Sequence, residues 1–271
     1  MAIANIGWTV ASSGAAGASP HLHSGAITPN NILVLAVTNR DADADVTVTD
    51  DETGGNAWTK LKRQAADTNG SGLIYWKRTV TTDATIQVDV EGGTGSTSLV
   101  LTGYTGAAKT SANPFSQTTI VGEANASGNL TQAQINVIVP GSMIIFTLHG
   151  TSNDTLAFGA EACDTPGALV EEGEGLSSTG SDCCVALSDG IKSAAGNTGA
   201  FTWTMGTAGT TASIACALEP ELPPTVALGT PADDATGVST TPDLVFTGTD
   251  TNADEVEYEV QVCSDSDFPN N

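Results

Sequence analysis

The sequence is short of basic residues: Lys and Arg number 8 among 271 residues, against 31 Asp and Glu, and the formal net charge is −23. Binding to nucleic-acid phosphates requires clustered Lys and Arg, so we expect no nucleic-acid partner. No apolar run approaches the ~18–20 residues of a membrane span, and we expect no membrane association. Aromatic residues make up only 5% of the chain, which argues against an aromatic-lined groove for sugar cleavage.

Signatures of catalysis are also missing. The sequence has three His, no Gly-x-Ser-x-Gly or His-Glu-x-x-His motif and no phosphate-binding Gly loop. His21 and His23 would share one face of an extended segment, but no third metal ligand accompanies them. We therefore predict that the chain is not an enzyme and that it needs no organic cofactor.

Cysteine and tryptophan are scarce, and both fit a core better than a site. The five cysteines leave at least one unpaired within the chain and match no zinc spacing: Cys163, Cys183, Cys184, Cys216 and Cys263. The adjacent pair would point to opposite faces of a strand. We expect buried thiols, with an interchain disulfide as the alternative. The four tryptophans fall at strand positions and are interpreted as core rather than as a sugar-stacking platform: Trp8, Trp58, Trp76 and Trp203.

Strand signals are abundant instead. Residues 31–37 are almost continuously apolar, as in a strand covered on both faces, and residues 85–90 alternate. The order of strand types then repeats, because residues 142–149 match residues 31–38, 111 positions earlier. We predict an all-β, jelly-roll-like antiparallel sandwich over residues 1–219. It would consist of two similar halves, about 1–109 and 131–219, each contributing strands to both sheets.

A proline-rich segment, residues 220–224, is predicted to be a stiff linker. The residues after it, with Pro231, the turn Gly237-Val-Ser, Pro242 and a predicted strand around Tyr258, resemble the start of a fibronectin type III or related Ig-like repeat. Such repeats occur in bacterial surface proteins and phage structural proteins. The resemblance implies a seven-stranded module of roughly 90–100 residues, so residues 225–271 would form an incomplete domain.

The first domain resembles Gly/Thr-rich β-domains of phage virion proteins. The resemblance rests on an apolar strand followed by Asn39-Arg-Asp41, Gly54-Gly-Asn-Ala-Trp-Thr59, Tyr75-Trp76 and Tyr104-Thr-Gly-Ala107. It implies a decoration or fibre protein on the exterior of a tailed-phage virion, which assembles with other virion proteins or with copies of itself. The first residues show no signal-peptide pattern, as expected for a particle assembled inside a cell. The alternative is an extracellular adhesin or carbohydrate-binding module of a bacterial surface, with a host-surface glycan as its partner.

The few basic residues cluster in the first half. Residues 1–109 hold seven of them and ten acids, whereas residues 110–271 hold one Lys and 21 acids. A hairpin turn at Asn69-Gly70 would bring two basic groups together. We predict a small positive patch that either protects a sheet edge or docks the acidic end of a neighbouring copy; its members are Lys60, Lys62, Arg63, Lys77 and Arg78.

Alternating carboxylates suggest one metal candidate. Asp41, Asp43 and Asp45 lie in a predicted loop, with further acids at positions 50–52. Calcium prefers several hard oxygen ligands on a flexible loop, although the EF-hand spacing is absent. A solvated acidic loop is the simpler expectation, and a calcium site is the alternative.

Overall fold

The computed structural model describes residues 2–14, 20–40, 45–68, 70–91, 95–108, 113–115, 121–125, 131–151, 158–177, 183–205, 210–230, 236, 238 and 243–249. These residues form strands, turns and loops, and no helix among them is long and apolar enough to cross a membrane. The prediction of an all-β fold is therefore confirmed. The chain divides into two compact units, Met1–Glu221 and Leu222–Asn271, and the boundary falls in the proline-rich segment.

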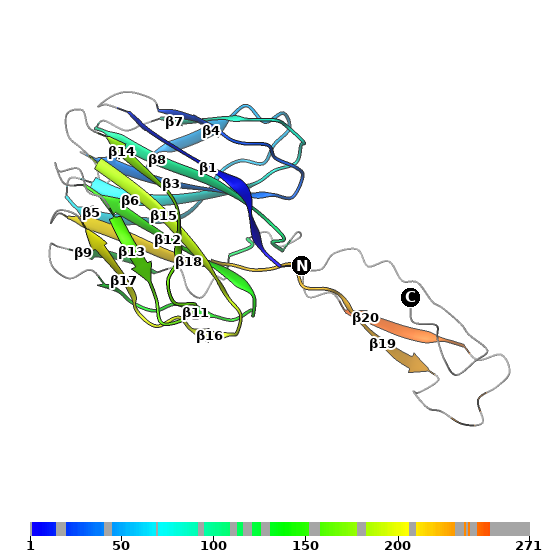
Figure 1. Ribbon diagram of the computed structural model, residues 1–271. Coiled ribbons are helices and arrows are strands. Elements are labelled where there is room, and N and C mark those ends of the chain that lie inside the picture. The colour runs from blue at the N-terminus through cyan, green and yellow to red at the C-terminus, as the bar shows by residue number, and fades with distance from the viewer. Residues whose placement is uncertain are drawn as a thin grey trace. The chain divides into compact units, whose positions relative to one another are not determined.

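The first half of the larger unit contains two antiparallel sheets (Figure 1). One has five strands in the order β1-β8-β3-β6-β5, and the other has three in the order β2-β7-β4. The strands are β1 (Ala4–Gly14), β2 (His21–His23), β3 (Ile32–Arg40), β4 (Thr47–Asp50), β5 (Thr59–Asp67), β6 (Gly70–Arg78), β7 (Gln87–Glu91) and β8 (Thr97–Thr105).

The second half repeats this arrangement strand for strand. Its five-stranded sheet has the order β9-β18-β12-β15-β14, its three-stranded sheet the order β10-β17-β13, and the short β11 and β16 pair with each other. In the first half an isolated bridge between Ile27 and Asp83 takes the place of that last pair. The strands are β9 (Val121–Asn125), β10 (Thr131–Gln132), β11 (Asn136–Val137), β12 (Ser142–Gly150), β13 (Phe158–Ala162), β14 (Val170–Ser177), β15 (Cys183–Lys192), β16 (Gly196–Asn197), β17 (Phe201–Met205) and β18 (Thr211–Leu218).

The way the strands are divided among the sheets differs from our expectation that each half contributes strands to both sheets of one sandwich. Every sheet takes its strands from one half only, so the halves do not combine strands within the two sheets of a single sandwich. Strands joined by short connections tend to pair with one another, which favours closure of each half on itself. The result is two similar antiparallel sandwiches, each made of a five-stranded and a three-stranded sheet.

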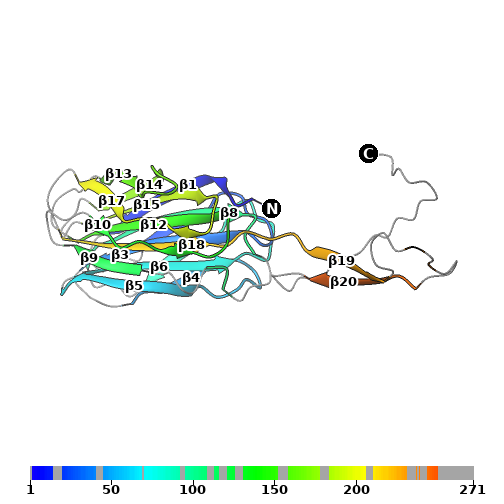
Figure 2. The same ribbon diagram turned by 90° about the horizontal axis from the view of Figure 1, so that it is seen from below.

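The two sandwiches stack through their five-stranded sheets, which gives four layers and three cores. A central core between the five-stranded sheets contains Val34 and Trp76 from the first half and Ile145 and Ile214 from the second. Each outer core fills the space between a five-stranded sheet and its own three-stranded partner. Figure 2 shows β3, β6, β12 and β18 between β4 on one side and β13 on the other. Strands β3 and β12 are buried on both faces, which explains their continuously apolar sequences.

The repeat brings two equivalent residues into contact. Ile32 pairs with Arg78, and Met143, 111 positions later, pairs with Ile191 in the corresponding strand. By the same offset Thr38 corresponds to His149, and the Thr38 hydroxyl lies 3.0 Å from the His149 Nδ1. Residues that are equivalent and touch must lie beside the pseudo-twofold axis that relates the halves.

The smaller unit contains two described strands, β19 (Thr225–Thr230) and β20 (Val245–Thr249), which pair antiparallel. The positions that carry the fibronectin-like resemblance, Pro231, Gly237, Pro242 and Tyr258, lie outside the described residues. The Ig-like character of this unit therefore stays a prediction.

Candidate functional site

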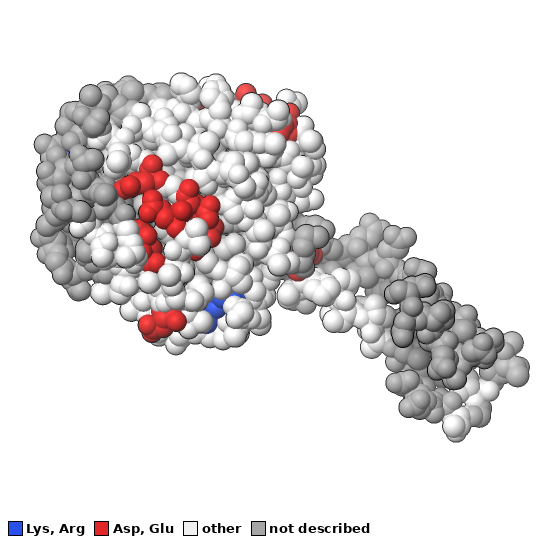
Figure 3. Space-filling model, viewed as in Figure 1, with Lys and Arg blue, Asp and Glu red and all other residues white. Residues whose placement is uncertain are grey.

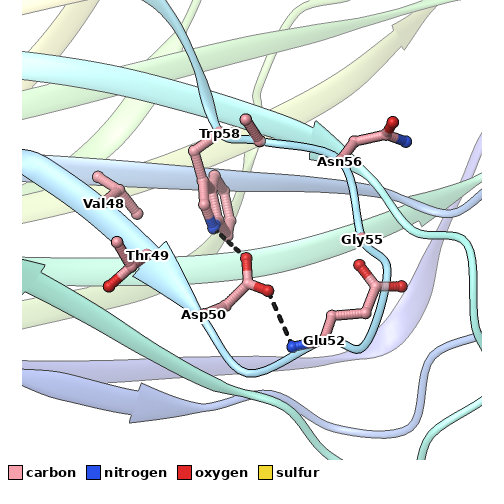
Figure 4. Close-up of a pocket in the computed structure, with 8 residues that line it drawn as sticks. Val48, Thr49, Asp50, Glu52, Gly55, Asn56 and Trp58 are labelled. Atoms are coloured by element: carbon pink, nitrogen blue, oxygen red, sulfur yellow. Dashed lines mark hydrogen bonds between the residues drawn. The ribbon is translucent and has the colours of Figure 1, made fainter.

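A hollow opens at the end of β4, where the chain turns from the three-stranded sheet toward β5 (Figure 4). It consists of two adjoining pockets that share Val48 and Trp58. The first is lined by Val48, Thr49, Asp50, Glu52, Gly55, Asn56, Ala57 and Trp58. The second adds Asp45, Val46, Thr47, Lys60 and Tyr75. The hollow combines polar side chains with an indole, which makes it a candidate binding site.

Two carboxylates that line the hollow, Asp50 and Glu52, contact a buried lysine behind them. Lys77 of β6 is 1% exposed, and its Nζ lies 2.7 Å from Asp50 Oδ2 and 2.7 Å from Glu52 Oε2. The indole ring of Trp58 lies 5.9 Å from the same nitrogen. Because Asp50 ends β4 and Lys77 belongs to β6, this ion triad joins the three-stranded sheet to the five-stranded sheet.

Each carboxylate is fixed by further donors. Glu52 Oε1 accepts hydrogen bonds from the backbone N–H groups of Val80 (2.7 Å) and Thr81 (3.0 Å) and from the Thr81 hydroxyl (3.0 Å). Burial alone would raise the pKa of Glu52, but these bonds and the one from Lys77 outweigh it and lower the pKa. Glu52 therefore stays ionised inside the protein.

Asp50 is held at both oxygens. Its Oδ2 accepts a hydrogen bond from the Trp58 Nε1–H at 2.5 Å, and its Oδ1 accepts the backbone N–H of Glu52 at 3.0 Å (Figure 4). The indole and the backbone thus orient the carboxyl group toward Lys77. Such oriented donors are the kind that stabilise negative charge on a carboxyl group as it reacts.

The turn that covers the triad depends on glycine. A Cβ at Gly55 would lie 2.5 Å from Glu52 Oε2 and 2.9 Å from Lys77 Nζ, so any larger residue would have to displace the buried ion pair. Gly54, beside it, has a positive φ of 69°, which L side chains rarely adopt. The local sequence Thr-Gly-Gly-Asn is therefore suited to close a tight loop over a buried charge.

The structure does not bring the five residues of the predicted basic patch together on the surface. Lys77 is buried in the triad, and the Arg78 Nη2 donates to the backbone carbonyl of Ala108 at 2.6 Å. On β5, Lys60 forms an ion pair with Asp45, and Arg63 lies 3.6 Å from the same carboxylate. The basic residues of β5 and those of β6 do lie on the neighbouring strands of a hairpin, as predicted. Lys62 is half-buried on β5, so at most the β5 members reach the surface together.

The calcium candidate receives no support from the described part of its loop. Asp41 and Asp43 lie outside the described residues, and Asp45 already faces Lys60 and Arg63. Within the described ranges no group of three or more His, Cys, Asp or Glu is arranged to hold a metal ion. His21 and His23 do lie on the exposed face of β2, with their ring centroids 5.7 Å apart.

The expectations for thiols and indoles are largely confirmed. Cys163, Cys183, Cys184 and Cys216 are buried, whereas Cys263 lies outside the described residues. Trp76 and Trp203 are core residues. Trp8 and Trp58, also predicted to be core residues, are only partly buried against the outer core of the first half, and Trp58 lines the hollow.

The ion triad was not predicted from the sequence, although the position of Lys77 in its strand indicates it. Leu73 and Tyr75 point from β6 into the outer core of the first half. Side chains of a strand alternate between its two faces, so Lys77, two residues after Tyr75, points to the same side. A lysine on the core side of a strand buried on both faces requires a carboxylate partner. Asp50 and Glu52 were available, but they were grouped with the acidic loop instead.

A comparison with protein-family models, with curated proteins and with solved structures finds no match to this chain. Its function must therefore be argued from its own architecture and from this hollow.

Proposed function

We propose that the chain is a structural component exposed on the exterior of a tailed-phage virion, where it acts by assembly with other virion proteins or with copies of itself. The observation that carries the proposal is the four-layered, duplicated β-architecture of residues 1–221. Three cores in one unit of this size fix the chain in a rigid block, as suits a protein whose task is to present surfaces. The resemblance of the sequence to phage β-domains agrees with this role.

The surface offers a feature suited to assembly. Strand β14 lies at an edge of its five-stranded sheet and exposes Val170 (61%) and Leu176 (39%) beside Glu171, Glu172 and Glu174. Figure 3 shows acidic side chains gathered on the face that contains this strand. Edge strands recruit partners through their free backbone groups, and charged neighbours limit that pairing to complementary surfaces. A basic strand or groove on a neighbouring virion protein would fit this edge.

Immunogold electron microscopy tests the proposal. Antibodies raised against the full chain should label intact particles released from the culture of origin, with equal labelling before and after the particles are disrupted. Labelling confined to the bacterial envelope would overturn the virion assignment in favour of a surface adhesin. Label that appears only after disruption would overturn the exterior position.

A second candidate function, glycan binding by an adhesin or carbohydrate-binding module, is favoured by the Trp58 hollow. An indole flanked by Asp50, Asn56 and Thr49 combines an apolar ring with hydrogen-bonding groups, which is what a sugar needs. A glycan array with the wild-type chain and Asn56→Ala tests it, with Asn197→Ala as an exposed control outside the hollow. Binding that Asn56→Ala abolishes and Asn197→Ala keeps would support this candidate; an array without signal would reject it.

A further inference from the structure

The contacts of Lys77 fit a chemical reaction between its amine and a neighbouring carboxyl group as well as an ion pair. Its amine lies 2.7 Å from a carboxylate oxygen of Asp50 and 2.7 Å from one of Glu52, and its side chain has no exposed surface. We propose that Lys77 and Asp50 condense into an intramolecular amide bond, with Glu52 as the group that relays the protons. Nothing in the proposed structural function requires this bond, so the two proposals stand or fall separately.

The two carboxylates are suited to different roles. Asp50 accepts hydrogen bonds at both oxygens, from Trp58 Nε1 and from the backbone N–H of Glu52, so negative charge that develops on its carboxyl group is stabilised. Glu52 uses Oε1 for three donors from Val80 and Thr81, while its buried Oε2 meets only the amine. The ionised Oε2, 2.7 Å from the Lys77 amine, is therefore the proton acceptor, and Asp50 is the electrophile.

The reaction balances without an external reactant. Glu52 Oε2 takes one proton from the Lys77 ammonium, and the neutral amine forms a bond to the Asp50 Cγ. The second surplus proton of the nitrogen and the proton held by Glu52 pass to one Asp50 oxygen, which leaves as water when its bond to Cγ breaks. Glu52 returns to its ionised state, and the amide keeps the other Asp50 oxygen and one N–H.

The surroundings favour the condensed form. Condensation replaces two buried ions, the Lys77 ammonium and the Asp50 carboxylate, with a neutral amide, while the Glu52 carboxylate keeps its three donors from Val80 and Thr81. Gly55 lies directly over the pair, and the side chains of Lys77, Glu52 and Asp50 are 0%, 0% and 7% exposed. The water that condensation releases leaves through the adjoining hollow, which Asp50 and Glu52 line.

The other half of the protein lacks the arrangement. Lys77 pairs with Leu33, and the corresponding pair in the second half is Gly190 with Ile144. A Cβ at Gly190 would lie 2.9 Å from both Leu169 and Pro166, so the matching space is filled by apolar groups. The lysine and its carboxylates are thus specific to one half of a duplicated fold, and the shared architecture does not require them.

The mass of the intact chain is the decisive measurement. Under denaturing conditions the purified full-length protein should be lighter than its sequence mass by one water. A tryptic digest should contain residues 41–60 joined to residues 64–78, with tandem spectra placing the bond between Asp50 and Lys77. A full sequence mass would overturn the proposal, and a bond from Lys77 to Glu52 would overturn the division of roles.

Variants separate the reaction from folding. Glu52→Gln keeps the shape of the side chain but removes the base, so this variant should fold and keep the full sequence mass. Two variants outside the triad, Asp51→Asn, which removes a neighbouring charge, and Lys60→Arg, which keeps one, should still lose one water. Loss of water in Glu52→Gln at the wild-type extent would show that Glu52 takes no part. A folded Lys77→Arg that still lost one water would place the bond elsewhere and overturn the proposal.

Discussion

Two buried groups at the interface between the halves have pKa values that are shifted in opposite directions. His149 is completely buried, and desolvation lowers its pKa from 6.5 to about 3. Asp189 accepts a hydrogen bond from the Tyr104 hydroxyl at 2.9 Å, and burial together with the nearby Glu172 raises its pKa from 3.8 to about 7. Between these limits the folded protein carries its proton on Asp189, whereas the unfolded chain carries it on His149.

The two effects on stability should cancel in the wild-type protein. The unfolded state binds more protons at His149, so this residue makes the free energy of unfolding rise with pH between about 3 and 6.5. The folded state binds more at Asp189, so that residue makes it fall between about 4 and 7. Each slope is about 1.4 kcal/mol per pH unit. As the pH rises from about 4.5 to about 6.5, the free energy of unfolding of Asp189→Asn should therefore increase by about 2–3 kcal/mol relative to that of wild type. That of His149→Gln should decrease by as much over the same range.

Urea unfolding followed by tryptophan fluorescence measures this difference. All four tryptophans belong to the unit Met1–Glu221, so the signal reports on the stacked sandwiches alone. Parallel pH profiles for wild type, Asp189→Asn and His149→Gln would refute the reasoning, because they would show that neither group changes its protonation on unfolding.

Three further predictions concern the first half. Lys77→Met removes the partner of two buried carboxyl groups, whether that partner is held by charge or by the proposed amide, and should lower the free energy of unfolding by about 3–5 kcal/mol in urea titrations, whereas Lys60→Met, at an exposed pair, should cost less than about 1 kcal/mol. Gly55→Ala should cost about 1–3 kcal/mol because its Cβ meets the triad, and Gly54→Ala about 1 kcal/mol from its positive φ alone; a Tm that Gly55→Ala left unchanged would contradict the closed loop. EDTA should leave the Tm unchanged, since Asp45 already binds two basic side chains, and a fall in Tm that calcium restores would establish the metal site.

The sequence was sufficient to predict the strands and their repetition because both depend on local patterns. The apolar run beginning at Ile32 predicted a strand buried on both faces, and the structure covers that strand with a sheet on each side. The offset of 111 residues was readable because Ile32–Thr38 and Met143–His149 occupy equivalent registers. Hairpins such as β5–β6 join neighbouring segments, so their turn signals were close at hand.

The partition of strands into sheets and the ion triad were not predictable in this way. Both depend on contacts between distant segments, and an apolar strand carries no mark of which sheet covers it. Asp50 and Lys77 are 27 positions apart and belong to different sheets, so their charges suggested a loop and a patch instead of a pair. The alternation that places Lys77 beside Leu73 and Tyr75 was the one local clue.

The two halves hold the same architecture together by different chemistry. In the second half, Phe146 stacks on Phe201 with centroids 4.8 Å apart, and Trp203 lies 5.6 Å from Phe146, so aromatic contacts join the three-stranded sheet to the five-stranded sheet. In the first half the same two layers are joined at Lys77 and Asp50. A covalent link there would close a loop of 27 residues, which the chain-entropy relation for cross-links values at about 3–4 kcal/mol. That is comparable to the contribution of a buried aromatic side chain, at about 3–5 kcal/mol. A single bond in one copy of a duplicated fold can therefore add about as much stability as a buried aromatic side chain adds in the other, while both copies keep the same strand order.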